Sequence, residues 1–183
     1  ELVGEFPELQ GIMGGYFAQS QGFDKDVCKA ISEQYLPAGL NTKVPKKPYS
    51  VALSLADKID TLVGFFGINE KPTSSKDPFA LRRIALGIIR TIIENKKNLK
   101  LNDLLSYSSS LYQDQEHNFI NDNSQKELHS FLKDRFKYYM KEKQIRFDII
   151  DASISSISLN KLFSTFEKAK SLNKIINNQV GLD

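Results

Sequence analysis

Basic side chains in two stretches of this sequence could bind nucleic acid, because positive charges spaced along a surface can follow a phosphate backbone. One stretch is the proline-interrupted loop from Lys43 to Tyr49, which also offers an aromatic ring. The other surrounds the predicted start of a helix at Asp77, and a helix N-terminus is itself a favourable phosphate site. The candidate contacts are Lys46, Lys47, Lys71, Lys76, Arg82, Arg83 and Arg90.

A third basic stretch runs from Lys133 to Arg146 and has six basic residues against two acidic ones. On a helix, such a stretch is more often a solvated face than a binding surface. Adjacent arginines such as Arg82 and Arg83 are equally suited to salt bridges between domains. The net charge of +3 permits a nucleic-acid partner without indicating one, so charge alone leaves these interpretations open.

Two predicted helices would position the arginines. In the first, apolar residues recur at three- and four-residue steps from Val51 to Phe66, and Gly67 is predicted to end the helix in the left-handed conformation. In the second, Asp77 and Pro78 predict the start, because Asp can cap orphan N–H groups and Pro suits the first helical position. The arginines of this second helix are left to solvent or a partner. Its buried stripe is predicted to comprise Leu81, Ile84, Ala85, Ile88, Ile89 and Ile92.

Helical periodicity also dominates the remaining sequence, and no segment has the pattern of a strand. A first helical face extends from Phe6 to Phe17, and a second helix is capped by Asp24 and ends before Pro37. Apolar stripes from Leu128 to Tyr139 and from Leu159 to Ile176 predict two later helices. We therefore predict an all-α fold, an irregular helical bundle.

Two lobes are expected in this bundle, over residues 1–98 and 99–183, with the boundary somewhere between 98 and 124. Shorter helices are predicted near 101–106 and 109–117, and the polar run 121–124 is the best candidate for a hinge. No apolar run approaches the ~18–20 residues that a membrane span needs. The single cysteine, Cys28, leaves no internal disulfide and fits a reducing cytoplasm.

The segment ADKIDTLVGFFGINEKPTSSKDPFALRRIALGIIR, residues 56–90, closely resembles a signature segment of the β subunit of bacterial heterotetrameric glycyl-tRNA synthetase. The resemblance extends to EFPELQGIMG at 5–14, EQYLP at 33–37 and, more weakly, IRFDIIDA at 145–152, all in the family's order. Family subunits are several times longer, so we expect an internal fragment. The resemblance implies an HD-like helical domain and a following helical segment, stopping short of the anticodon-binding domain.

The HD-like resemblance raises the hypothesis of a metal-dependent phosphohydrolase, whose chemistry needs clustered histidines and carboxylates. Asp57 resembles a later Asp ligand of that superfamily, but no histidine precedes His117, and Gln34 stands where relatives commonly have one. A lone carboxylate does not hold a catalytic metal, so we expect no metal site and a structural role for Asp57. The two histidines, His117 and His129, are expected at the surface.

The glycines from Gly11 to Gly15 lack both the GK[ST] ending and the preceding strand of a phosphate loop, so they predict close helix packing or a helix break. The resemblance places the pocket for glycine and ATP, with its Mg²⁺, in the separate α subunit. This region is expected to bind and position glycine tRNA and to support assembly with the α subunit and the remaining β-subunit domains, without catalysis. The alternative is a purely structural scaffold between domains.

Overall fold

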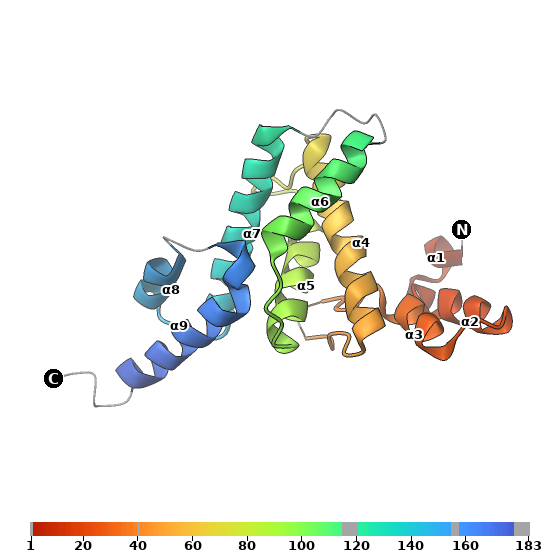
Figure 1. Ribbon diagram of the computed structural model, residues 1–183, viewed down its shortest axis with the longest axis horizontal. Helices are drawn as coiled ribbons and strands as arrows, with labels where there is room; N and C mark the ends of the chain where they lie inside the picture. The colour runs from red at the N-terminus through yellow and green to blue at the C-terminus, as the bar shows by residue number, and fades with distance from the viewer. Residues whose placement is uncertain (1, 40, 115–120, 155–157, 178–183) are drawn as a thin grey trace.

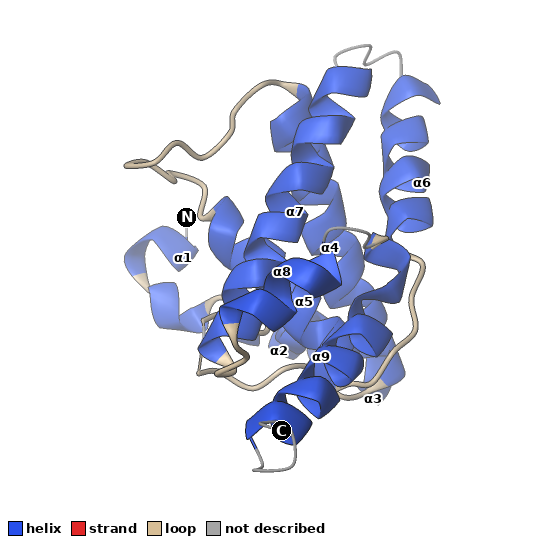
Figure 2. Ribbon diagram, turned by 90° about the vertical axis from the view of Figure 1, so that its left-hand side faces the viewer, coloured by secondary structure: helices blue, strands red, loops and turns tan. Residues whose placement is uncertain are grey.

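The computed structural model of the chain describes residues 2–39, 41–114, 121–154 and 158–177. Within these ranges every regular element is a helix, as Figure 2 shows, which confirms the predicted all-α class. Two short 3₁₀ helices are η1 (Pro7–Leu9) and η2 (Leu159–Lys161). The α-helices are α1 (Leu2–Glu5), α2 (Ile12–Ser20), α3 (Lys25–Glu33), α4 (Pro48–Gly67), α5 (Leu81–Glu94), α6 (Leu101–Asp114), α7 (Asp122–Glu142), α8 (Phe147–Ile154) and α9 (Leu162–Asn177).

The core lies where α4, α5 and α7 meet; α6 packs on α4, α9 on α5, and α8 on α7 and α9 (Figure 1). The apolar stripes predicted for the three central helices are confirmed, and Leu62, Ile88 and Phe136 are completely buried. Residues three and four apart share one face of a helix, which is why these side chains converge. One continuous cluster extends from Val51 to Ala169, so the boundary predicted between 98 and 124 does not coincide with a break in the core.

Two helix boundaries differ from the prediction. Gly67 is the last residue of α4, but the left-handed conformation falls on Asn69, whose φ is 64°. The carboxylate of Asp77 does act as a cap, because it accepts the N–H groups of the first two residues of α5 at 2.8 and 3.0 Å. The helix nevertheless begins at Leu81, because Ala80 before it is itself left-handed, with a φ of 54°.

The segment around α6 and α7 is more regular than predicted. The two helices expected over 101–106 and 109–117 form one helix, α6, as far as Asp114, and residues 115–117 lie outside the described residues. At the start of α7, the Asn121 side chain accepts the N–H of Ser124 at 2.9 Å, and the Ser124 hydroxyl accepts the N–H of Asn121 at 3.1 Å. This reciprocal capping box means that the polar run predicted as a hinge starts a helix.

Helices α1 to α3 form a unit at one end of the molecule, which joins the rest mainly through α3 against α4 (Figure 1). The continuous helical face predicted from Phe6 to Phe17 is wrong, because Gly11, with a φ of 80°, separates η1 from α2. The aromatic side chains of this stretch are exposed, since α2 is covered mainly by α3. Tyr16, for example, keeps 60% of its surface in solvent.

The glycines of α2 permit this helix to approach α3 closely, as the sequence predicted. A Cβ atom added to Gly15 would lie 1.9 Å from the Ser32 hydroxyl oxygen and 3.1 Å from the Cys28 carbonyl oxygen. Both distances are shorter than ordinary van der Waals contact, so a larger residue requires the Ser32 hydroxyl to move and the Cys28 carbonyl group to shift slightly.

Replacing Gly15 with Ala should therefore lower the free energy of unfolding by about 1–3 kcal/mol, as overpacking of a tight contact does. Urea unfolding followed by circular dichroism measures the change. Gly4→Ala is the matched control, because a Cβ at Gly4 meets no atom within 4 Å. A gain of stability in both variants would show that helix propensity, which favours Ala over Gly, and not the contact with Ser32, decides the result.

Candidate nucleic-acid interface

Two of the four cations predicted at the start of α5 are already bonded inside the molecule. The Arg82 guanidinium donates to the Thr73 carbonyl oxygen and lies 3.9 Å from the carboxylate of Asp77. The Lys71 ammonium lies 2.6 Å from the Glu127 carboxylate on α7. These contacts tie the loop before α5 to the bundle, and exposed ion pairs of this kind leave less charge for a partner.

The other two cations at this end, Arg83 and Lys76, are exposed. Neither side chain forms a hydrogen bond or an ion pair with any residue that the structure describes. They are therefore the predicted residues in the 71–83 stretch whose charge is available to an anionic partner.

Arg90 was predicted to be left to solvent or to a partner, and this is wrong: the residue is only 7% exposed. Its guanidinium donates to the carbonyl oxygens of Gly39 and Thr42, each at 2.6 Å, and to the Glu94 carboxylate at 2.7 Å. Backbone carbonyls that are removed from water need donors, and the planar guanidinium supplies several from one side chain. Arg90 thus holds the preceding loop on α5.

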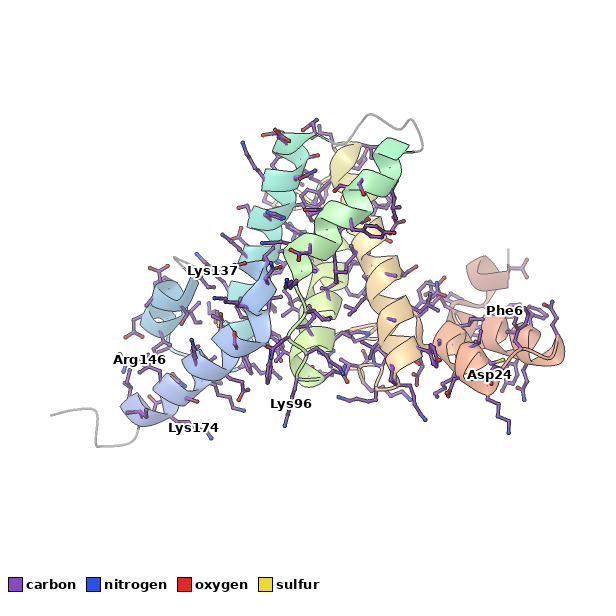
Figure 3. The ribbon with its side chains drawn as sticks, viewed as in Figure 1. Phe6, Asp24, Lys96, Lys137, Arg146 and Lys174 are labelled. Carbon is purple, nitrogen blue, oxygen red and sulfur yellow. The ribbon has the colours of Figure 1, made fainter. Side chains whose placement is uncertain are left out.

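The loop from Pro37 to Lys47 consequently runs along α5 toward its C-terminal end. Asn95 donates to the Pro45 carbonyl oxygen at 3.0 Å, and the Lys46 ammonium donates to the Glu94 carbonyl oxygen at 3.0 Å. Exposed lysines of the loop therefore gather where α5 ends, next to the lysines that follow it, and Figure 3 shows Lys96 projecting from this end. We call Lys46, Lys47, Lys96 and Lys97 the α5-end lysines.

Lys96 and Lys97 were not among the predicted contacts. The available signal was their position directly after a helix, where cations favour the negative end of the helix dipole. The exposed predicted residues lie in two groups, one at each end of α5. Arg83 and Glu94 are eleven residues apart on α5, so about 16 Å separates the α5-end lysines from Arg83.

Arg83 also lines a pocket of about 330 Å³ between α4 and α5, which we call the α4–α5 pocket. Lys58, Asp57 and Thr61 of α4 contribute polar groups to it, and Tyr35 and Phe79 contribute aromatic rings. The Phe79 ring packs on the ring of Phe65, and the two ring centroids lie 4.2 Å apart. Charged groups and flat apolar surfaces therefore meet in one open cavity.

Lys58 is the most unusual group in this pocket, because it is only 5% exposed. Its ammonium donates to the Gln34 carbonyl oxygen at 2.9 Å and to the Ser54 hydroxyl at 3.0 Å. Burial lowers the pKa of Lys58 to about 8, although the neighbouring Asp57 works in the opposite direction. The sequence spacing indicated this burial. Lys58 lies three residues after Leu55 and four before Leu62, and this spacing places it on the buried face of α4.

Asp57 meets Gln34, the residue that follows α3. The Gln34 amide donates to the Asp57 carboxylate at 3.4 Å. Burial raises the pKa of Asp57, while the Lys58 charge opposes the rise. Among the described residues no group of three or more His, Cys, Asp or Glu side chains is placed to hold a metal ion. His129 is partly buried, and His117 lies outside the described residues.

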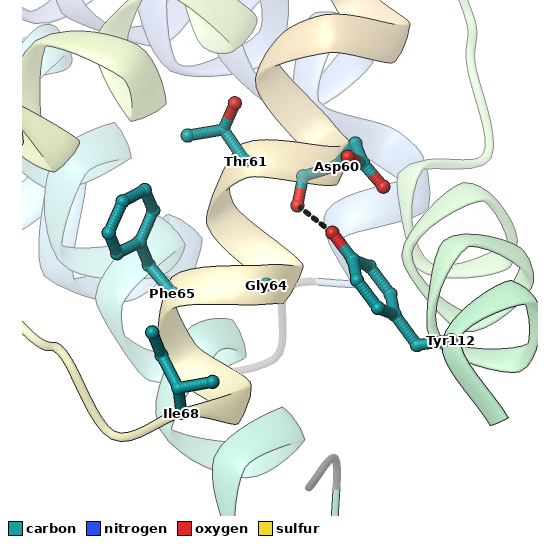
Figure 4. A pocket seen from close by; sticks show the side chains of 6 residues that line it. All are labelled: Asp60, Thr61, Gly64, Phe65, Ile68 and Tyr112. Atoms are coloured by element: carbon teal, nitrogen blue, oxygen red, sulfur yellow. Dashed lines mark hydrogen bonds between the residues drawn. The ribbon is translucent and has the colours of Figure 1, made fainter. Parts of the chain in front are cut away.

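A second open pocket, of about 370 Å³, lies between α4 and α6 and contains no basic side chain among its lining residues (Figure 4). The Tyr112 hydroxyl donates to the Asp60 carbonyl oxygen at 3.4 Å. Burial and the Asp60 charge raise the pKa of Tyr112. A Cβ on Gly64 would lie 2.8 Å from the Tyr112 oxygen, so this glycine permits the contact. With an acidic residue and no cation, this pocket is unsuited to phosphate.

Three of the six basic residues from Lys133 to Arg146 contact their own neighbours, among them Lys143, whose ammonium lies 5.3 Å from the Tyr139 ring centroid. The Arg135 guanidinium lies 5.8 Å from the ring centroids of both Phe131 and Tyr138, and Arg146 pairs with Asp148 at 2.8 Å. Such cation–π and ion-pair contacts suit a solvated helix face. Lys133, Lys137 and Lys141 form no hydrogen bond, ion pair or ring contact with the residues that the structure describes, so this stretch remains a candidate beside the α5 face.

None of the described helices has the length and apolar content that crossing a membrane would require.

The sequence profile of the family described as "Glycyl-tRNA synthetase beta subunit" matches residues 1–155. Curated relatives are named glycine–tRNA ligase beta subunit. The one from Rickettsia canadensis (strain McKiel) is 45% identical over 182 residues, which are 99% of this chain and 26% of that protein.

Two further relatives carry the same name. The protein from Ruegeria sp. (strain TM1040) is 42% identical over 183 residues, covering 99% of this chain and 25% of that protein. The protein from Rhodospirillum centenum (strain ATCC 51521 / SW) is 48% identical over 151 residues, covering 82% of this chain and 21% of that protein. The chain thus spans about a quarter of the length of the first two relatives.

Replacing Arg90 with Ala should lower the free energy of unfolding by about 2–4 kcal/mol, because the Thr42 carbonyl oxygen and the Glu94 carboxylate lose their donor and the Gly39 carbonyl oxygen loses its charged one. Thermal or urea unfolding measures the loss. Arg90→Lys should recover only part of it, since an ammonium cannot reproduce the planar set of bonds. Arg83→Ala is the control from the same helix, and a loss of equal size there would contradict the role assigned to Arg90.

The pH dependence of unfolding tests the burial of Lys58. Its pKa is about 8 in the folded protein against an ordinary value of 10.5, so between these pH values the unfolded chain holds a proton that the folded chain lacks. Stability therefore rises with pH across this window, by an amount on the order of 2–3 kcal/mol. Lys58→Met should lack the rise, and the tyrosine contributions cancel in the comparison. If the free energy of unfolding, measured with urea, changed by the same amount in both proteins from pH ~7 to ~10, the burial of Lys58 would be contradicted.

Proposed function

Because the chain belongs to the glycyl-tRNA synthetase beta subunit family, we propose that it forms a tRNA-positioning part of a glycine–tRNA ligase. The observation that carries the proposal is the set of exposed cations along α5. Arg83 and Lys76 at its start have no partner among the described residues, and the α5-end lysines gather at the other end. Phosphate groups of an RNA are the partners that such a distribution fits.

The mechanism is positional. The complete ligase joins glycine to its tRNA using ATP, and the proposal assigns ATP, its Mg²⁺ and the chemical step to the α subunit. The described part of this chain contributes affinity for the phosphate backbone, which is not specific to sequence but fixes register and orientation. When the RNA is held in place, its reaction at a distant catalytic pocket no longer depends on a free collision between two molecules. A cytoplasmic location follows from the same proposal.

The spacing of the cations supports contact with a backbone and not with a single anion. About 16 Å along α5 separates the two groups, and several consecutive phosphates cover such a span. The paired cations Arg82 and Lys71 then serve to hold the loop before α5. Lys46 takes an intermediate position, because its ammonium is bonded to the Glu94 carbonyl oxygen yet remains exposed.

A role in subunit assembly is the second candidate, and the exposed apolar residues of the first three helices favour it. Phe6, Ile12, Tyr16, Phe17 and Phe23 are each at least 45% exposed. Large exposed apolar side chains gathered on one small unit are typical of contact surfaces. The α subunit and the remaining parts of a longer β subunit are the partners that this candidate assigns to them.

Titration of the chain with glycine tRNA tests the first candidate. Arg83→Ala should weaken binding about five- to tenfold and lower the salt dependence by about one phosphate contact, because an unpaired cation is lost. Arg82→Ala is the matched control, since its guanidinium is already paired, and it should change affinity by less than about twofold. Fluorescence anisotropy at low and moderate salt measures both quantities.

The same titration separates the candidates. Binding that prefers glycine tRNA over a non-cognate tRNA and weakens steeply with salt supports a specific tRNA surface. Equal weak binding to both tRNAs would assign discrimination to another part of the ligase. Absence of binding at low salt would overturn the tRNA role of this chain and leave the assembly role of its exposed aromatic residues.

A further inference from the structure

We propose that the α4–α5 pocket binds one ribonucleotide, with its phosphate between Arg83 and Lys58, its 2′-hydroxyl on Asp57 and its base against Tyr35 or Phe79. The proposal shares Arg83 with the suggested tRNA surface, but it stands on the pocket itself. A free nucleotide and an unpaired nucleotide of an RNA present the same groups.

The first argument is charge. Arg83 has no partner among the described residues, and the acceptors of the Lys58 ammonium are a carbonyl and a hydroxyl, both neutral. These acceptors take two of the three N–H donors of the ammonium. Asp57 is the acidic residue of the lining, so the pocket holds two cations against one carboxylate. A buried cation with incomplete compensation is stabilised by an anion that enters its cavity.

The second argument is the hydrogen-bonding capacity left on Asp57. One carboxylate oxygen accepts the Gln34 amide at 3.4 Å, and a carboxylate can accept several more bonds. The negative charge of the Asp57 carboxylate would repel a phosphate oxygen, whereas a sugar hydroxyl can donate a hydrogen bond to it. Carboxylates bind ribose hydroxyls in this way at dinucleotide sites, and a 2′-hydroxyl is the group that distinguishes RNA from DNA.

The third argument is shape. The pocket volume of about 330 Å³ lies within the range of about 300–1,000 Å³ that small-molecule sites occupy. Tyr35 and Phe79 are 41% and 44% exposed, so their rings offer free surface to a planar group. Base–aromatic stacking tolerates any base, because every base has a π-face. The pocket therefore fits a nucleotide better than a bare phosphate ion.

Isothermal titration of the chain with AMP, dAMP and inorganic phosphate tests the proposal. AMP should bind at least about tenfold more tightly than phosphate and severalfold more tightly than dAMP. Arg83→Ala should weaken AMP about tenfold or more, while Arg82→Ala, one residue away and outside the pocket, should leave it unchanged. Asp57→Ala should lower the affinity for AMP to that for dAMP, and it should not weaken the binding of dAMP.

A second measurement reports on Lys58 without replacing it. The NMR shift of its Cε group, followed against pH, should show the pKa of Lys58 rising when AMP is bound, because an anion favours the charged ammonium. Asp57 of α4 is the charged group that acts on Lys58, and Arg83 of α5 lines the same pocket; the comparison with and without AMP leaves both residues in place. An unchanged titration at saturating AMP would place the ligand elsewhere and overturn the proposal.

The outcomes distinguish this proposal from the tRNA role. If tRNA binds and AMP does not, the pocket proposal fails alone. If AMP binds as described and tRNA does not, the tRNA role fails and the pocket serves a free nucleotide. A short single-stranded RNA that competes with AMP would identify the RNA as the source of the nucleotide. Equal binding of AMP and phosphate, or AMP binding that is insensitive to Arg83→Ala, would overturn the pocket assignment.

Discussion

The bonds of the Arg90 guanidinium determine where the loop from Pro37 to Lys47 lies. If the guanidinium were absent, the Thr42 carbonyl oxygen would face α5 without its donor, and the Gly39 carbonyl oxygen would keep only the N–H and hydroxyl of Thr42. Because the loop lies on α5, Pro37 becomes a wall of the α4–α5 pocket and the loop lysines reach the end of the helix. A charged side chain on the helix face thus arranges both the pocket and the basic surface beside it.

The apolar part of the fold could be predicted because it depends on periodicity alone. Leu62, Ile88 and Phe136 recur at helical spacing with their neighbours, and burial of one helix face follows wherever the partner helices lie. The exposure of Tyr16 could not be predicted, since the same periodicity occurs on a helix that only one neighbour covers. The start of α5 was misplaced because the backbone conformation of Ala80 depends on the loop before it.

Of the candidate site, the sequence indicated Arg83 correctly as an exposed group and misjudged Arg90, although both are arginines on one helix. The difference is tertiary: a loop covers Arg90, and no sequence pattern showed where that loop lies. Lys58 was overlooked because a lysine is normally assigned to the surface, even though its spacing placed it on the buried face of α4. The approach of Gln34 to Asp57 likewise required the packing of α3 on α4.

The contact between α3 and α4 has a thermodynamic consequence for the pocket. Carbonyl oxygens of Gln34 and Leu36, just after α3, accept bonds from Lys58 and Ser54 of α4, and Tyr35 lies between them. A ligand that touches both Tyr35 and Arg83 bridges the N-terminal unit and the main core. Linkage is reciprocal. The factor by which docking of the unit raises the affinity of the pocket for the ligand is therefore the factor by which the bound ligand raises the equilibrium constant for docking. Amide hydrogen exchange in α2 and α3, far from any phosphate, would then report on the occupancy of the pocket.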